Sequence, residues 1–376
     1  MAFRACVVVM ILIASGGCAF AESRLRINGT VDGKPARFML DTGLSYDLAA
    51  LPDGAGRLGL SVVKPPSPED SASVLMKGFS ATHQLRFAPE AAEQEGVFVQ
   101  LKAAPEEIGV EWDFDAMIGW PAIRANVLYY ALGRGAARLE PSVLIDLSPG
   151  QTFPLVQSNV AVLDVGSPDA PLPVMIDTGA NAGVQLSAPL WKAWREAHPL
   201  QLMTLRSAYS PATGTVVTPQ GFAPVLRLGR LTLRNVLVSE LPESRHYGAV
   251  RPEAILGLDV FSNQDLYLDG PGKKVVILPP AELALVDYNR IGAAFTPPRF
   301  AAQVVQGGPA SRADIRDGDV LVRLDGLTPQ AYAAKVTAPS VWMQPNGTPI
   351  TLTLRRGEQL IERRVVLEDF LGQTAP

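Results

Sequence analysis

Two aspartates in matching surroundings are the residues of this chain best suited to do chemistry. The tripeptides Asp41-Thr42-Gly43 and Asp177-Thr178-Gly179 each follow an apolar, strand-like run. Two carboxyl groups a few ångströms apart cannot both ionise cheaply, so such a pair holds one proton between them. The charged member can act as a general base on a bound water, while the neutral member donates a proton to a carbonyl oxygen. The pair therefore predicts hydrolysis without a metal.

The residues that follow each aspartate suit the same role. A glycine lets the backbone turn tightly and bring amide N–H groups close to the carboxylate. A buried threonine hydroxyl can form a hydrogen bond across to the other half and fix the geometry. A single Asp-Thr-Gly would be a weak signal, but two copies after two apolar runs are a stronger one.

A second pair of matching segments indicates an internal duplication. Ala116-Met117-Ile118-Gly119-Trp120 and Ala254-Ile255-Leu256-Gly257-Leu258 share an apolar-apolar-Gly signature. Gly119 lies 78 residues after Asp41, and Gly257 lies 80 residues after Asp177. Repeats at a fixed spacing are a strong guide to a fold. We therefore expect two similar halves, each supplying one aspartate.

Short alternating runs between turn residues predict that the chain is mainly β. With 33 glycines and 32 prolines spread along it, the composition fits many short strands better than long helices. Residues 188–198 give the clearest helical pattern. Trp191 and Trp194 are three residues apart and so share a helix face, where core packing is the expected role.

The pattern changes after Pro280, where residues 285–376 predict a smaller β unit. Gly308-Pro309-Ala310, Ala313-Asp314-Ile315 and Gly318-Asp319-Val320-Leu321 form a run of turn and strand signals. Asp314 is tolerable at a left-handed position because aspartate adopts that conformation more easily than most residues. About 90 residues are enough for a small domain.

Composition excludes several classes of function. The net charge of −4 gives no sign of a nucleic-acid surface. Three histidines, His83, His198 and His246, do not have the spacing of metal ligands, so we expect neither a metal nor a cofactor.

The N-terminus has the pattern of a secretory signal, residues 1–21. Arg4 precedes an apolar stretch, and Ala19-Phe20-Ala21 is a small-x-small site that predicts cleavage after Ala21. Both cysteines precede that site, which favours a secreted or periplasmic chain without disulfides. Ser15-Gly16-Gly17-Cys18 offers lipid anchoring at Cys18 as the weaker alternative.

On these residues the chain resembles the pepsin/retropepsin superfamily of aspartic proteases. The resemblance covers roughly residues 24–280 and implies an acid-protease fold of two pseudo-symmetric β lobes, 22–141 and 142–280. It implies that Asp41 and Asp177 are catalytic and that Thr42 and Thr178 link the lobes. It also implies that Ile118-Gly119 and Leu256-Gly257 pack beneath the aspartates.

Some residues depart from that family pattern. Leu44 follows the first Asp-Thr-Gly, where the family usually has a small residue, whereas Ala180 fits the second copy. Candidate flap tips are Met76-Lys77-Gly78-Phe79 and Ser210-Pro211-Ala212-Thr213-Gly214.

The C-terminal unit resembles a bacterial-type PDZ domain, spanning 285–376. PDZ domains bind a peptide by adding it as a strand to a sheet edge. The candidate loop for a C-terminal peptide is Gly292-Ala293-Ala294-Phe295. A degenerate scaffold domain without a ligand is the alternative.

Together these features predict an exported, monomeric aspartic endopeptidase whose PDZ domain recruits or orients a protein substrate. The alternative is a protease-like envelope protein that binds peptides without cleaving them. A homodimeric enzyme is a weaker third reading because the chain already carries two motifs.

Overall fold

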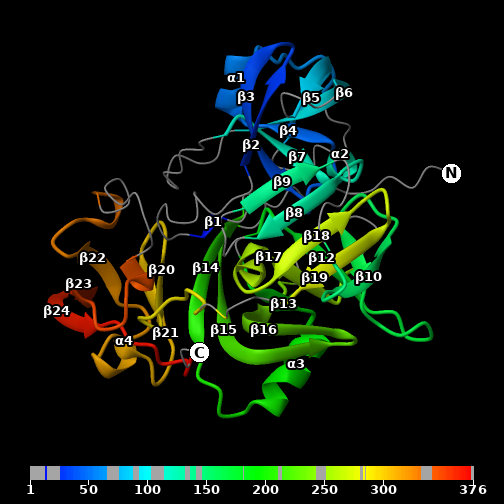
Figure 1. Cartoon of the computed structure of the whole chain (residues 1–376). Coiled ribbons are helices and arrows are strands. Elements are labelled where there is room, and N and C mark those ends of the chain that lie inside the picture. The colour runs from blue at the N-terminus through cyan, green and yellow to red at the C-terminus, as the bar shows by residue number, and fades with distance from the viewer. Residues whose placement is uncertain are drawn as a thin grey trace.

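The computed structural model describes residues 13–14, 26–65, 76–87, 93–102, 114–131, 136–140, 146–180, 182–210, 214–242, 251–279, 283, 285–331 and 341–373. The predicted signal sequence, apart from residues 13–14, lies outside these described residues, as does Cys18. Strands dominate the chain, which confirms the prediction of a mainly β protein (Figure 1).

The first half, residues 26–140, is built on a closed barrel with the strand order β2-β3-β7-β4-β6-β5. Burial alternates at the start of β5, whereas the last four residues of β3, the last four of β6 and all of β7 are buried. Its elements are β2 (Arg26–Val31), β3 (Lys34–Asp41), β4 (Leu48–Ala50), α1 (Pro52–Leu58), β5 (Met76–Arg86), β6 (Gln94–Leu101), β7 (Ala116–Gly119), α2 (Trp120–Ile123), β8 (Val127–Ala131) and β9 (Ala136–Glu140).

The second half, residues 146–279, repeats the pairing of the first. Its sheet contains the order β11-β12-β17-β13-β16-β15, which matches β2-β3-β7-β4-β6-β5 strand for strand. Its elements are β10 (Gln151–Val156), β11 (Val162–Asp164), β12 (Pro173–Asp177), β13 (Val184–Leu186), α3 (Ala188–Ala197), β14 (Thr204–Ser210), β15 (Gly214–Leu228), β16 (Leu231–Glu240), β17 (Ala254–Gly257), η4 (Leu258–Ser262), β18 (Asp265–Asp269) and β19 (Lys274–Leu278).

The two halves meet through equivalent strands. β8 of the first half pairs antiparallel with β18 of the second, and Tyr129 lies directly opposite Tyr267. Their rings lie 4.6 Å apart between centroids. Because these tyrosines are also equivalent in the duplication, a local two-fold axis passes between them. One large apolar cluster includes Leu40 and Ile176 from the two halves.

The helix predicted at 188–198 is present as α3, which ends at Ala197. Trp194 is buried and Trp191 packs partly against the core, which confirms their predicted packing role. Among the described residues, no helix is both long and apolar enough to cross a membrane.

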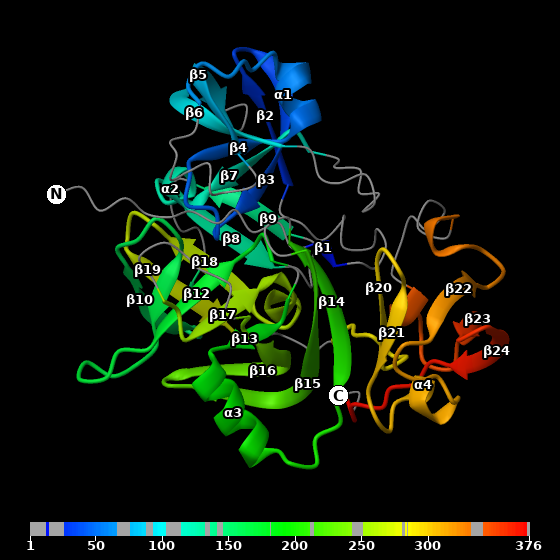
Figure 2. The same cartoon turned by 180° about the vertical axis from the view of Figure 1, so that it is seen from behind.

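The C-terminal unit, residues 285–373, is a five-stranded sheet with its own apolar core, in the order β20-β21-β22-β23-β24. Figures 1 and 2 show β20 beside β14 of the second half from both sides. Its elements are β20 (Ala293–Thr296), β21 (Ala301–Val304), α4 (Pro309–Arg312), β22 (Val320–Leu324), η5 (Val341–Met343), β23 (Pro349–Arg356) and β24 (Gln359–Val366).

Candidate active site

Both predicted catalytic aspartates end a buried strand at the junction of the halves. Asp41 is the last residue of β3 and Asp177 the last of β12, with 2% and 0% of their surfaces exposed. Each strand runs parallel to the strand that bears the glycine signature, so Asp41 aligns with Gly119 and Asp177 with Gly257. The duplication therefore places the two carboxyl groups in equivalent settings.

The turn after each aspartate holds its carboxylate. Gly43 N–H donates to Asp41 Oδ1 at 2.9 Å, and Gly179 N–H donates to Asp177 Oδ1 at 3.1 Å. A methyl group at Gly43 would lie 2.5 Å from Asp177 Oδ1, and one at Gly179 would lie 2.5 Å from Asp41 Oδ2. Each carboxyl group thus lies against the glycine of the opposite turn, which brings both acids to one place.

The two threonines cross-link the turns. Thr42 Oγ1 donates to the Ile176 carbonyl at 2.7 Å, and Thr178 Oγ1 donates to the Leu40 carbonyl at 2.9 Å. Each hydroxyl also accepts from the other threonine's backbone N–H, at 3.0 and 3.1 Å. Four hydrogen bonds therefore hold the turns together, and burial strengthens them because water cannot compete.

The signature glycines are needed because a loop presses on each of them. A side chain at Gly119 would lie 1.9 Å from the Tyr46 carbonyl, and one at Gly257 would lie 2.3 Å from the Ala182 carbonyl. Ile118 and Leu256, one residue earlier, are fully buried in the main core. These four residues lie in the strands beside the aspartates.

Leu44 occupies an apolar cluster on the aspartate side of the first sheet, and it is 1% exposed. It packs with Met39 and Met117, and its backbone N–H donates to the Asp41 carbonyl at 3.1 Å. The equivalent Ala180 lies in a smaller cluster with Met175. The side chain of Leu44 thus packs within the apolar cluster of the first half.

A pocket of about 360 Å³ opens beside this cluster. It spans the junction, since Asn159 comes from the second half and the remaining lining residues come from the first. Two residues after Asn159, Ala161 N–H donates to the Thr42 carbonyl at 3.0 Å. The lining residues are Ser45, Tyr46, Asp47, Phe79, Val97, Val99, Pro121, Arg124 and Asn159.

The predicted peptide-binding run of the C-terminal unit lies on an edge strand. Gly292 has φ of 68°, and Ala293, Ala294 and Phe295 belong to β20. That edge faces the second half, where Thr204 Oγ1 donates to the Asn289 carbonyl at 2.5 Å. Asn289 Nδ2 in turn donates to the Leu205 carbonyl at 3.0 Å. The run therefore lies next to the β14–β15 hairpin.

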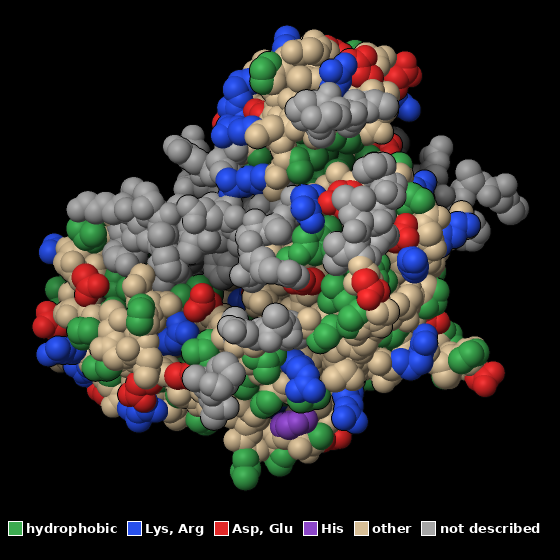
Figure 3. Space-filling model, viewed as in Figure 1, with side chains coloured by type: hydrophobic (Ala, Val, Ile, Leu, Met, Phe, Trp, Pro, Cys, Tyr) green, Lys and Arg blue, Asp and Glu red, His purple; other side chains and the backbone are tan. Residues whose placement is uncertain are grey.

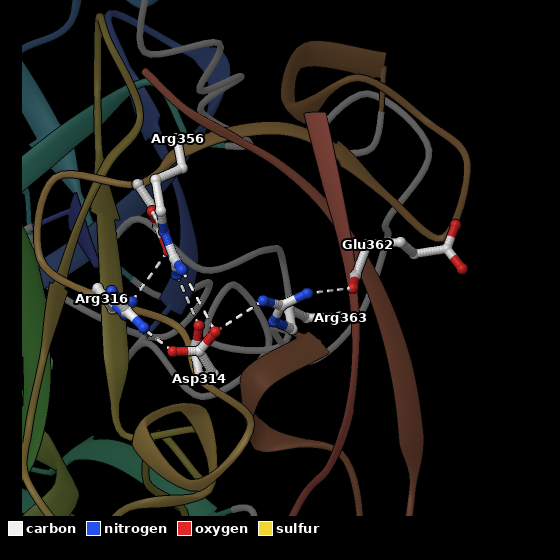
Figure 4. Close-up of polar contacts among 6 residues, drawn as sticks. Asp314, Arg316, Arg356, Glu362 and Arg363 are labelled. Carbon is white, nitrogen blue, oxygen red and sulfur yellow. Dashed lines mark hydrogen bonds and ion pairs between the residues drawn. The ribbon is translucent and has the colours of Figure 1, made fainter. Parts of the chain in front are cut away.

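Asp314 in the same unit is left-handed, with φ of 56°, as the sequence predicted. Figure 4 shows three arginine side chains converging on its carboxylate. Arg363 and Arg316 donate at 2.7 and 2.8 Å, and Arg356 donates at 3.3 Å. These bonds, that of Arg363 first, hold the pKa of Asp314 below its usual range. The network fixes the turn.

A titratable group on η4, Asp259, was not expected from the sequence. Burial is the main reason that the pKa of Asp259 is raised to about 6; Arg206 opposes the rise, and Asp287 adds a smaller contribution to it. Asp259 lies on η4, two residues after Gly257. Aligning the two halves could have singled out Asp259, because the equivalent residue of the first half is the uncharged Pro121.

The flap candidates have different outcomes. Residues 76–79 lie inside β5, so the prediction of a hairpin tip there was wrong. Ser210 and Gly214 end β14 and begin β15, and residues 211–213 between them lie outside the described residues.

Within the described ranges, charged and metal-binding groups give no other candidate. Figure 3 shows acidic and basic side chains interspersed over the described part of one face. The described residues contain no cluster of three or more potential metal ligands. No protein-family model matches the chain, and no curated protein matches it.

Proposed function

We propose that this protein is an aspartic endopeptidase of the pepsin/retropepsin type, with residues 22–141 and 142–280 as its lobes. The observation that carries the proposal is the crossed threonine network together with the contact of each carboxyl group with the opposite glycine. A pair of buried acids held by symmetric turns is an arrangement suited to sharing one proton.

In the proposed reaction, the charged carboxylate removes a proton from a water molecule whose oxygen attacks the peptide carbonyl carbon. The neutral carboxyl group gives its proton to the carbonyl oxygen, forming a diol. The diol collapses as the C–N bond breaks, the amine nitrogen takes a proton, and the original protonation of the pair is restored. Asp41 and Asp177 are the two acids, and no metal or cofactor is required.

An extended peptide is the substrate that the geometry favours. The backbone of β14 already pairs antiparallel with β1 (Ile13–Ala14), so its edge accepts an added strand. Backbone pairing of this kind binds many sequences, and side-chain pockets then select among them. The C-terminal unit, proposed to be a PDZ-like domain, would bind the C-terminal end of a peptide at Gly292–Phe295. We propose export after cleavage at Ala21, with anchoring at Cys18 as the alternative.

The test is cleavage of a peptide library by the full chain and by Asp41→Asn and Asp177→Asn. Each variant is expected to lose at least about 1000-fold in kcat/KM because one role of the pair is removed. Asp53→Asn, at an exposed position in the first turn of α1, is the matched control and should leave activity unchanged. Undiminished turnover in either pair variant, with circular dichroism showing a folded chain, would reject the mechanism.

The second candidate function is a peptide-binding protein that does not cleave. The near-complete burial of both carboxyl groups favours it, because a substrate must reach them. Retained peptide binding by the wild-type chain, without cleavage across the library from pH 3 to 8, would support this function over the first.

A further inference from the structure

The two halves differ most in the side chains that share a face with the aspartates. The pairing registers identify equivalent positions. Phe79 pairs with Val99 in the first half as Gln220 pairs with Ser239 in the second. Ala49 opposite Met117 likewise matches Gln185 opposite Ile255. Directly opposed residues project to the same side of a sheet, so each set lines one face.

These faces are the ones that carry the catalytic carboxyl groups. Side chains alternate along a strand, and Leu40 and Ile176 project into the main core. Their neighbours Asp41 and Asp177 therefore project to the opposite side. Next to the aspartates both faces are apolar, with Met39 and Met175 at equivalent positions.

Farther from the aspartate, the first half stays apolar. Ala49 and Val99 join the cluster around Leu44, and Tyr46 and Phe79 pack against it. Tyr46 and Phe79 meet edge to face with centroids 6.1 Å apart. Both rings also line the 360 Å³ pocket. The pocket has two aromatic walls beside the polar side chains of Ser45, Asp47, Arg124 and Asn159, so it fits a large side chain whose apolar body lies against the rings.

The second half is polar at the same positions. Gln185, Gln220 and Ser239 are 1%, 3% and 1% exposed, where the first half has Ala49, Phe79 and Val99. Ser239 Oγ is buried and has no hydrogen-bond partner among the residues that the structure describes.

The unpartnered hydroxyl of Ser239 points to a ligand that hydrogen-bonds, because burying a hydroxyl without a partner costs free energy. A ligand side chain that forms a hydrogen bond with Ser239 on binding would recover that cost. An apolar substrate side chain would leave Ser239 unsatisfied.

The C-terminal unit completes the polar side. Phe222 and Leu237 are covered by Val286, Tyr288 and Leu371. Val97, at the position equivalent to Leu237, is instead 39% exposed and lines the open pocket. The first half therefore borders an open pocket, whereas the equivalent face of the second half packs against the C-terminal unit.

We infer that the groove selects opposite chemistry on its two sides. An extended peptide places a large apolar side chain against the first half and an amide- or hydroxyl-bearing side chain against the second. This inference rests on the proposed function and adds the substrate class to it. Val99 and Ser239, with Phe79 and Gln220, are the specificity-determining residues.

The experiment measures both cleavage and binding of a peptide library randomised on the two sides of a central bond, using the full chain. Wild type is expected to prefer large apolar residues on one side and Gln, Asn, Ser or Thr on the other. Ser239→Val should weaken the polar preference about 10-fold and leave the apolar one unchanged. Val99→Ser should weaken only the apolar preference. Thr353→Val, in the C-terminal sheet, is the matched control.

The outcomes separate this inference from the proposed function. Cleavage with the same apolar preference on both sides would overturn the inference and leave the protease proposal standing. Side-dependent binding without cleavage would reject hydrolysis and still support the asymmetric groove. Binding without any side preference, or a Ser239→Val profile identical to that of wild type, would overturn the inference.

Discussion

The two halves of the chain share one centre and differ at the periphery. At the centre, the Asp-Thr-Gly turns form the same four crossed bonds from each side, and both aspartates align with a glycine. At the periphery, the first half has an open pocket where the second half is covered by the C-terminal unit. The difference indicates that each turn must keep its sequence to fit the other turn. The outer face of each half has no such requirement, so the two faces can differ.

The largest expected effect tests the shared centre. Gly43→Ala and Gly179→Ala each push a methyl group to 2.5 Å from the opposite carboxyl group. In the proposed protease, displacing a catalytic group by even about 1 Å costs on the order of 100-fold in rate, so each variant should lose at least that much. Kinetics on a peptide substrate measure the loss.

The control for these glycine variants is Gly56→Ala on α1, where a methyl group meets no atom within 4 Å. It should be neutral or slightly stabilising because alanine favours a helix. A tenfold or greater difference between Gly43→Ala and Gly179→Ala would break the equivalence of the two turns.

This centre was the part of the site that the sequence predicted best. The matching spacing from each aspartate to its signature glycine predicted two equivalent halves, and Asp41 aligns with Gly119 as Asp177 aligns with Gly257. Local patterns succeed here because an apolar run followed by Asp-Thr-Gly favours a strand that ends in a tight turn. The left-handed backbone of Asp314 was likewise predictable from local sequence, because it depends on the residue type at one turn position.

Other features depend on contacts between distant segments and could not be predicted. Placing the first flap tip at residues 76–79 was wrong because their alternation fits a strand as well as a turn. The docking of Tyr288 on Phe222 left no pattern within either segment. The polar set at Gln185 and Ser239 became visible only once the registers matched them to Ala49 and Val99.

The next largest effect tests the crossed bonds. Thr42→Val and Thr178→Val each remove a donor to a carbonyl and an acceptor for an N–H. Each change leaves buried backbone groups unpaired, so the free energy of unfolding should fall by about 3 kcal/mol. Urea denaturation measures it. The double variant should lose less than the sum, since both residues belong to one network. Full additivity would show that the network does not act as a unit.

A smaller effect sharpens the contrast between the halves. Leu44→Ala opens a cavity in the first cluster and should lower the free energy of unfolding by about 2–3 kcal/mol. The reciprocal Ala180→Leu overfills the smaller second cluster and should cost about 1–3 kcal/mol. Thermal and urea denaturation of both variants measure these costs. If Ala180→Leu left the free energy of unfolding unchanged, the second cluster would accommodate a leucine as the first does, and the two halves would not differ at this position.

The smallest effect concerns the charge found only in the second half. The pKa of Asp259 is about 6 in the folded chain, above its ordinary value of 3.8, chiefly because of burial. Folding thus favours the neutral form of Asp259. The contribution of Asp259 to the free energy of unfolding is therefore fully present below pH 3.8 and is lost as the pH rises through 6. Asp259→Asn should therefore be more stable than wild type by about 1 kcal/mol at pH 8, since the partial exposure of Asp259 reduces the penalty.

That gain should vanish at pH 4, where the wild-type carboxyl group is largely neutral. Thermal denaturation between pH 4 and 8 gives the comparison, with Asp53→Asn as the exposed control. The first half has Pro121 at the equivalent position, so no titration there can mimic the effect. A gain that is the same at both pH values would mean that Asp259 keeps its ordinary pKa. The charge on η4 would then not distinguish the halves.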